Sequence, residues 1–484
     1  MKIKEVVNMK YKLKYDLSDL LNSNFKVSLD EDVISSILSN INVKRGLLYK
    51  KLSNLKSQEN KKVLSIKSSF LINWKYGKRI PLDCFNLLCN LSNSNINDYQ
   101  HFIYAISSGC SKVDWKISFP LNLNERFFFI SETIRTEGNI MKGKFINCPQ
   151  GVAISNKDVF FLNLFEKNLK KLNVCGNFTK LLCVNIYLPE DTKINYVLNN
   201  DSNSKLHFHF KKGRLVFLDK VNNFNINNSY HISINGVREK VEVIVDNNNL
   251  VSVNSHLHST AFVSLQVYSS VFARFLSEYF SIPFGIGYNK SYNIDFPFDI
   301  NLLSDHLMKI ILDVVISCEG HISKSGTKRI DIKLKNKYYL EKMMLILDRL
   351  NIKSSIFNLG AGFFLLRISK RRNLEKFSEL IKLSVRYKQK DLLRLINSYD
   401  LSRVVYGERD LNYLSVLINR GPSTAKSVGN ILGKKSNTAL IDLNRLEKKQ
   451  YVRKFGRKHN GRGSTPWTFE ITKEGKLIYE DTKK

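Results

Sequence analysis

Two segments of the chain, 127–140 (FFFISETIRTEGNI) and 309–322 (KIILDVVISCEGHI), share one pattern: an apolar helical stretch that ends in Glu-Gly, then one polar residue and an Ile. In both, the apolar residues recur on one helical face. The glycine after each Glu predicts that the helix ends there in the left-handed conformation. Glu137 and Glu319 would then lie in a last helical turn, where the helix dipole disfavours a carboxylate. Two such acids indicate a cation site built from two pseudo-equivalent halves.

The composition indicates a polyanionic partner. The chain has 484 residues, which predicts roughly two to four domains, and a formal net charge of +33, which favours nucleic acid as the partner. An AT-rich genome that inflates Lys, Asn and Ile is the alternative explanation. The seven cysteines show no C-x-x-C spacing, which is typical of reduced thiols. With neither a signal peptide nor a membrane span in the sequence, we expect a soluble cytoplasmic, nucleoid-associated protein with no membrane partner.

Residues 1–115 are predicted to be all helical. Within them, residues 65–93 contain a serine-rich start, a helix over 68–76 that ends at Gly77, and Pro81 opening a second helix. This order resembles the Cro/C1-type helix-turn-helix, in which the first of these helices would enter the major groove. The resemblance implies DNA contacts from Ser68, Asn73, Lys75, Lys78 and Arg79. A helical domain with a basic surface is the alternative.

The same order of elements is predicted after each Glu-Gly. The second half reads helix, strand, strand, helix, strand, strand, helix within 304–400. The first half, 126–300, has this order with a β-rich insertion at about 185–250, where apolar and polar residues alternate.

Residues 408–484 are predicted to form a separate winged helix. Three helices over 411–419, 424–432 and 436–449 are followed by an alternating segment that folds back around Asn460-Gly461. The last helix region and the basic wing are expected to contact DNA through the following residues: Lys434, Lys435, Asn437, Arg445, Arg453, Lys454, Arg457, Lys458 and Arg462.

The pair ISETIRTEG (130–138) and LDVVISCEG (312–320) resembles the LAGLIDADG homing endonuclease family in its two-repeat, single-chain form. The resemblance covers roughly 127–386. It implies an α+β fold in which a duplicated α-β-β-α-β-β-α unit forms a pseudo-twofold saddle on double-stranded DNA. The protein would be a free-standing monomer, flanked by the all-α helix-turn-helix domain and the winged helix.

The resemblance also implies a mechanism. Glu137 and Glu319 would be catalytic and would bind two or more Mg²⁺ ions, and the backbone carbonyls of Thr136 and Cys318 would reach the same metals. The activity would be a site-specific double-strand cut by phosphodiester hydrolysis. In the family a basic residue on a nearby strand assists. The candidates, which the sequence does not rank, are Lys142, Lys144, Lys333, Lys335, Lys353 and Arg367. All of these except Lys353 are also expected to contact DNA.

The sequence departs from the family at the helix crossing. Ser131, Glu132, Asp313 and Val314 stand where small residues are usual, so two extra acids lie near the seam. Two other functions stay open: a DNA-binding transcription regulator that uses the saddle without cutting, and a maturase that binds intron RNA. Two predicted duplex-DNA modules argue against RNA as the main partner.

Overall fold

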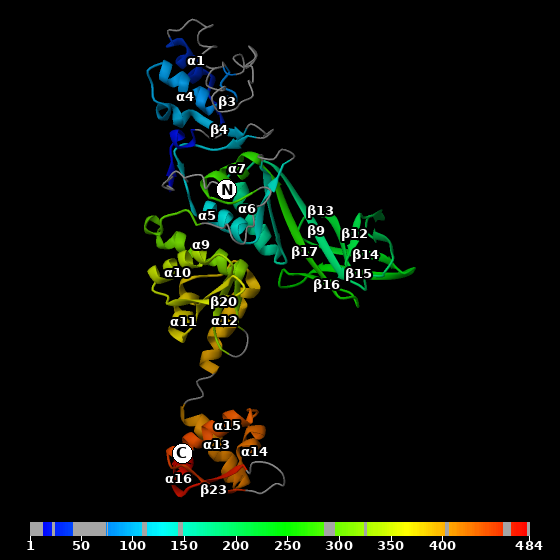
Figure 1. Ribbon diagram of the computed structural model, residues 1–484, viewed down its shortest axis with the longest axis vertical. Helices are drawn as coiled ribbons and strands as arrows, with labels where there is room; N and C mark the ends of the chain where they lie inside the picture. Colours follow the sequence, from blue (N-terminus) through cyan, green and yellow to red (C-terminus); the bar gives the residue numbers. More distant parts are fainter. Residues whose placement is uncertain are drawn as a thin grey trace. The chain divides into compact units, whose positions relative to one another are not determined.

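The computed structural model describes residues 13–21, 25–41, 74, 76–108, 114–143, 149–284, 296–323, 327–401, 406–457 and 466–481. The chain forms two compact units, Met1–Leu395 and Ile396–Lys484 (Figure 1). No helix in the described ranges combines the length and apolarity that a membrane crossing requires.

The N-terminal part of the larger unit contains a sheet, so the prediction that it is all helical is wrong. Four strands pair in the order β3-β2-β4-β5, all antiparallel. They are β2 (Phe25–Leu29), β3 (Ile80–Pro81), β4 (Ile103–Ser108) and β5 (Trp115–Lys116), and they accompany α1 (Glu31–Ser39), α4 (Leu82–Leu91) and the 3-10 helix η2 (Ile96–Phe102). The short apolar runs of β2 and β4 fit a buried strand as well as a helix, which is why periodicity alone misassigned them.

Most of the expected recognition helix over 68–76 lies outside the described residues, which include only Trp74 and Tyr76 of it. The chain before the first repeat also contributes β1 (Lys14–Tyr15), which pairs with β6 (Leu121–Asn122), and the 3-10 helix η1 (Leu17–Leu20).

The central part of the larger unit contains the same fold twice. The first repeat consists of α5 (Glu125–Thr136), β7 (Gly138–Lys142), β8 (Pro149–Asn156), α6 (Val159–Lys171), β9 (Asn177–Tyr187), β17 (Ser259–Tyr268) and α7 (Ser270–Tyr279). The second consists of α9 (Asp305–Glu319), β18 (Gly320–Ile322), β19 (Ile330–Leu334), α10 (Lys337–Arg349), β20 (Ser354–Gly360), β21 (Phe363–Ile368) and α11 (Arg371–Leu380), preceded by the 3-10 helix η3 (Ile300–Leu302).

The two sheets have matching connections. The strands of the first repeat lie in the order β7-β8-β17-β9, and those of the second lie in the order β18-β19-β21-β20. In both, the last two strands of the repeat exchange places relative to their order along the chain. Helices α6 and α7 pack on the first sheet, and α10 packs on the second. This arrangement confirms the predicted α+β class and the repeated order of elements.

The insertion of the first repeat occupies 188–258, between β9 and β17. Its strands are β10 (Ile194–Asn199), β11 (Ser204–Lys205), β12 (Phe208–Lys211), β13 (Arg214–Val221), β14 (Asn227–Ile234), β15 (Val237–Val245) and β16 (Val251–Asn254). β12 and β13 extend the repeat's sheet beyond β9, and the others form a second sheet in the order β11-β10-β14-β15-β16. A buried network joins them, because the Tyr230 hydroxyl and the Asn199 amide both donate to Asp219, at 2.8 and 2.7 Å. Figure 1 shows these strands in green and teal.

Helices α5 and α9 form the seam between the repeats, and no other pair of described helices packs more extensively. The glycines that follow them are required by close contacts within each repeat. Gly320 is extended (φ −71, ψ 139), and neither it nor Gly138 has a positive φ, so the predicted left-handed helix ends are wrong. A Cβ on Gly320 would lie 2.5 Å from the Ile316 carbonyl oxygen, and one on Gly138 would lie 2.7 Å from that of Ala153. Glycine is required here because a side chain would not fit.

One of the two extra acids at the seam is neutralised inside the protein. Glu132 is fully buried, and its carboxylate accepts hydrogen bonds from Arg135 Nε at 3.0 Å and from the Tyr339 hydroxyl at 2.7 Å. Arg135 also donates to the Phe280 carbonyl at 2.8 Å. Burial and the Glu132 carboxylate raise the pKa of Tyr339 well above its ordinary value, so the hydroxyl remains a donor. Because Tyr339 belongs to α10, this network ties the first motif helix to the second repeat.

The smaller unit consists of helices and a three-stranded sheet. Its elements are α13 (Tyr406–Arg420), β22 (Ser423–Thr424), α14 (Ala425–Ile431), α15 (Ser436–Lys448), β23 (Val452–Arg457), β24 (Trp467–Ile471) and α16 (Lys473–Asp481), with the sheet in the order β22-β24-β23. Leu414, Leu443 and Phe469 belong to its apolar core. The tip of the β23–β24 hairpin lies outside the described residues.

The seam network predicts the effect of removing one hydroxyl. Tyr339→Phe should lower the free energy of unfolding by about 1–3 kcal/mol, because the buried Glu132 carboxylate loses a donor. The neighbouring Tyr338 is 51% exposed, so Tyr338→Phe is a matched control that should cost little. Urea unfolding of the two variants measures the difference. Equal values would show that the hydroxyl contributes nothing to the seam.

Candidate active site

The C-terminal ends of α5 and α9 meet. Thr136, near the end of α5, lies within hydrogen-bonding reach of the Cys318 thiol on α9. Glu137 and Glu319 are the next residues in the two helices, and Glu137 caps α5 through its N–H, which donates to the Thr133 carbonyl at 2.9 Å. The chain thus brings both glutamates to one end of the seam.

The charges of the two glutamate carboxylates affect the pKa values of the same two groups, the Cys318 thiol and the Lys388 ammonium. Burial raises the pKa of the Cys318 thiol, and the charges of Glu137 and Glu319 raise it further. Burial lowers the pKa of Lys388, and the same two carboxylates oppose this effect. Since Coulomb interactions fall with distance, the two acids share one small region around Cys318 and Lys388.

Lys388 is a site residue that the sequence did not reveal. It lies in α12 (Arg386–Leu401), and its Nζ donates to the backbone carbonyls of Cys318 at 3.0 Å and Ile316 at 3.3 Å. The basic candidates predicted from the sequence lie on or beside strands near each motif helix, and nothing in the sequence distinguishes Lys388 from Lys390 two residues later. The Cys318 carbonyl, which was expected to reach a metal ion, therefore accepts a hydrogen bond from an ammonium group.

The start of α12 is held by polar groups of both repeats. Asp313 of α9 accepts from the Ser384 N–H at 2.6 Å and from the Ser317 hydroxyl at 2.9 Å. Asp158, which caps α6 in the first repeat, accepts from the Arg386 N–H at 3.0 Å. This anchoring fixes the position of Lys388.

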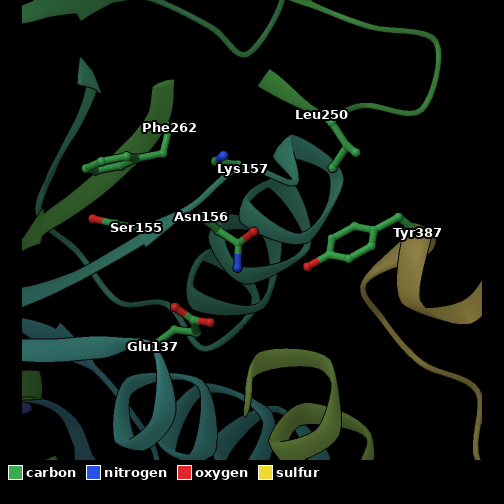
Figure 2. A pocket seen from close by; sticks show the side chains of 7 residues that line it. All are labelled: Glu137, Ser155, Asn156, Lys157, Leu250, Phe262 and Tyr387. Carbon is green, nitrogen blue, oxygen red and sulfur yellow. The ribbon is translucent and has the colours of Figure 1, made fainter. Parts of the chain in front are cut away.

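A cleft of about 420 Å³ opens beside Glu137 (Figure 2). It is lined by Glu137, Ser155, Asn156, Lys157, Leu250, Phe262 and Tyr387. Figure 2 shows the Glu137 carboxylate at the bottom of the view and the Tyr387 hydroxyl pointing inward from α12. Burial and the Glu137 charge raise the pKa of Tyr387, so its hydroxyl is a proton donor to any group in the cleft. Leu250 belongs to the insertion, which thus forms one wall.

The second sheet carries three of the residues predicted to contact DNA, Lys333, Lys335 and Arg367. Each of them contacts an aromatic ring or an acid of the same sheet. Lys333 and Lys335 lie over the Phe363 ring, at 4.6 and 5.0 Å. Arg367 makes two hydrogen bonds to Asp331, at 2.7 and 3.0 Å, so its charge is partly compensated within the sheet. In the first repeat Lys142 is exposed at the end of β7, whereas Lys144 lies outside the described residues. Lys353 is exposed before β20.

Among the described residues of the smaller unit that are predicted to contact DNA, some pair with acids and others are exposed or partly exposed. Arg445 pairs with Asp410, Arg453 with Glu470 at 2.9 Å, and Lys454 with Glu447 at 2.8 Å. The first of these pairs joins α15 to α13, which gives Arg445 a structural role. Lys435 and Asn437 are exposed at the start of α15, and Lys434 is partly exposed beside them. The Arg457 side chain, Lys458 and Arg462 lie outside the described residues.

Of the N-terminal residues predicted to contact DNA, the structure describes Lys78 and Arg79. Lys78 is exposed, and Arg79 pairs with Asp114 at 3.1 Å. Ser68, Asn73 and Lys75 lie outside the described residues. The structure therefore does not test whether this region contains a helix-turn-helix.

The residues at the glutamates fit a hard divalent cation. The available donors are carboxylate and carbonyl oxygens, which suit Mg²⁺, an ion that keeps several of its waters. The described residues contain no cluster of three or more His, Cys, Asp or Glu that could hold a metal ion by side chains alone. A cationic group already lies at this place, because the Lys388 ammonium donates to the Cys318 carbonyl at the end of α9.

Comparisons with known proteins bear on the second repeat. A family model described as a LAGLIDADG-like domain matches residues 311–382, so the second repeat is LAGLIDADG-like and the resemblance is confirmed in part. No curated protein matches the chain. Similar solved structures include the homing endonuclease I-DmoI in complex with DNA and Mn, at 15% identity over 53% of this chain and 96% of that chain, with a TM-score of 0.28.

Two further solved structures are similar. Full-length DUF199/WhiA from Thermatoga maritima is 10% identical over 67% of this chain and 92% of that chain, with a TM-score of 0.27. The homing endonuclease I-WcaI bound to its DNA recognition sequence is 10% identical over 55% and 85%, with a TM-score of 0.28. At such scores these likenesses add nothing to the function, which must be argued from the residues of this chain.

The environment of Asp313 predicts a pH dependence. Burial raises its pKa from 3.8 to about 6, so the folded protein holds the proton more tightly than the unfolded chain. Stability should therefore fall as pH rises from about 4 to 6, by about 3 kcal/mol from this group. Asp313→Asn cannot ionise and should lack that decline.

Urea unfolding between pH 4 and 7 measures this effect as the difference between the wild type and Asp313→Asn, in which other titrations cancel. Asp348→Asn is a matched control, because Asp348 is exposed on the adjacent α10. A difference that does not change with pH would contradict the predicted environment of Asp313.

Proposed function

We propose that the chain is a site-specific DNA endonuclease of the LAGLIDADG homing type that makes a Mg²⁺-dependent double-strand cut. The observation that supports this most directly is that Glu137 and Glu319 occupy matching positions at the ends of two packed helices. The charges of both carboxylates affect the pKa values of Cys318 and Lys388. Paired acids at the end of a seam between two matching repeats suit a reaction that is carried out twice, once on each strand of a duplex.

In this mechanism Glu137 and Glu319 would hold the metal ions, together with the carbonyls of Thr136 and Cys318. A bound divalent ion supplies a nucleophilic water and stabilises the leaving oxygen. The remaining steps fall to the chain itself. Lys333 and Lys335 would contact phosphates from the second sheet, and the Tyr387 hydroxyl would donate to a group that enters the cleft beside Glu137.

The flanking parts would lengthen the DNA interface. The smaller unit follows the element order of a winged helix, with α15 as the helix that reads DNA and β23–β24 as the wing. Its exposed Lys435 and Asn437 support this role, whereas the internally paired Arg445 does not. The basic balance of the whole chain favours the same partner, double-stranded DNA.

One observation favours a second function, a DNA-binding regulator that does not cut. The Cys318 carbonyl, a potential metal ligand, is already bonded to Lys388. The two functions are separated by incubation with duplexes that the protein itself selects from a random pool. Bound but uncut DNA in Mg²⁺ and in Mn²⁺ would favour the regulator.

Neutralising the acids tests the endonuclease. Glu137→Gln and Glu319→Gln should each reduce cleavage of at least one strand by on the order of 100-fold or more, because an ionised metal ligand is lost. DNA affinity in Ca²⁺ should change little. Strand-specific labels on the selected duplex measure both cuts.

Glu125→Gln is the matched control, since Glu125 is an exposed acid at the opposite end of α5 that pairs with His306. Loss of folding or of DNA affinity in the two site variants, with Glu125→Gln unaffected, would show that the glutamates are structural.

The start of α15 tests the proposed winged helix. Replacing Lys434 and Lys435 by Ala should weaken binding to all duplexes and reduce the salt slope of log affinity by about 1–2, since each phosphate contact contributes about 0.9. Lys473 and Lys476 are exposed on α16 of the same unit and provide the control pair. A slope that is the same in both double variants would remove α15 from the DNA interface.

A further inference from the structure

We propose that Lys388 is a built-in cation of the paired-glutamate site, which neutralises the acids when no divalent ion is bound and competes with that ion for the Cys318 carbonyl. This inference deepens the proposed function, on which it rests only for the identity of the competing ion. The contacts of Lys388 itself are independent of any activity.

The end of α9 concentrates negative charge. The last carbonyls of a helix carry the negative end of its dipole, and here Glu319 is added at the same place. The end of α5, with Glu137, meets it there. Two carboxylates and two helix ends in one partly buried region repel one another unless a positive charge lies among them.

Lys388 supplies that charge at a defined position. Its Nζ lies 3.0 Å from the Cys318 carbonyl oxygen and 3.3 Å from that of Ile316, so it occupies the end of α9 directly. Burial disfavours its charged form, and the charges of Glu137 and Glu319 favour it. The ammonium group is therefore held by the two carbonyls, and the charges of the two acids favour its protonated form.

The segment that carries Lys388 is built to hold it there. Asp313 accepts from the N–H and the hydroxyl of Ser384, and the Ser317 hydroxyl accepts from the Val385 N–H at 3.2 Å. On the other side of the seam, Asp158 accepts from the Arg386 N–H, and the Arg386 guanidinium lies 3.7 Å from the centre of the Phe160 ring. A lysine that served only solubility would need none of these contacts.

A competition follows from the shared oxygen. A divalent ion held by Glu319 would use the Cys318 carbonyl as a further ligand, but Lys388 already donates to that oxygen. Binding of the ion must therefore displace or shift an ammonium group that the acids attract. Lys388 sets the threshold of ion concentration at which the site takes up metal, and it keeps the seam stable below that threshold.

The test compares Lys388→Met with Lys390→Met in the full chain, without DNA. Lys390 is exposed on the same helix and contacts Asn248 of the insertion, so it controls for the loss of one lysine from α12. In EDTA, the Lys388→Met protein should have the lower melting temperature. On titration with Ca²⁺, its half-maximal stabilisation should occur at a concentration roughly tenfold lower than in the wild type, because the competitor is gone.

A second variant tests whether Lys388 stabilises the protein by compensating the charge of the acids or only by donating hydrogen bonds to the end of α9. Adding Glu319→Gln to Lys388→Met should restore part of the melting temperature lost in EDTA, since the carboxylate no longer needs a counter-charge. This comparison also applies if Lys388→Met alone fails to fold, because the double variant should then fold.

Three results would overturn the inference: equal melting temperatures of Lys388→Met and Lys390→Met in EDTA, weaker Ca²⁺ stabilisation of Lys388→Met, or losses from Glu319→Gln and Lys388→Met that merely add. The outcome is separate from that of the proposed function. A protein that never cuts DNA but shows this coupling supports Lys388 as the cation, whereas one that cuts without it supports the endonuclease alone.

Discussion

The close packing of α5 against α9 is the constraint on which the other features of the larger unit depend. It brings the two repeats together. It also places an acid, Glu132, in a fully buried position, where Arg135 and Tyr339 donate hydrogen bonds to its carboxylate. Removing one partner of a buried charge costs more free energy than the pair as a whole contributes to stability. A different packing of the two repeats, which would break this network, is therefore disfavoured.

The sequence predicted the features that have a local cause and missed those that depend on distant segments. The repeated helix-Glu-Gly pattern and the order of helices and strands along the chain after it follow from periodicity, and both appear in the structure. The two glycines are required for a reason that the sequence does not show, because a Cβ on Gly320 would lie 2.5 Å from the carbonyl oxygen of Ile316 in the preceding helix. The N-terminal strands were read as helix since a short apolar run fits either.

The candidate site shows the same division. Glu137 and Glu319 stand out in the sequence because each ends a patterned helix, whereas Lys388 lies in an ordinary basic segment. Its position becomes visible only when Asp313 and Asp158, which belong to different repeats, are seen to hold the same turn of chain. Arg445 illustrates another contact that the sequence does not show, since this basic residue on the expected DNA-reading helix pairs with Asp410.

The insertion makes the duplicated fold asymmetric, because it is present in the first repeat and has no counterpart between the matching strands of the second. In the second repeat, β20 and β21 are joined by a tight turn at Ala361 and Gly362, while the matching point of the first repeat carries the whole β-rich insertion. That insertion returns to the start of α6, where Leu250 bridges to Asp158 and helps to wall the cleft beside Glu137. No matching insertion stands between β20 and β21 of the second repeat. The two glutamates therefore lie in unequal surroundings, although the repeats that carry them have matching elements.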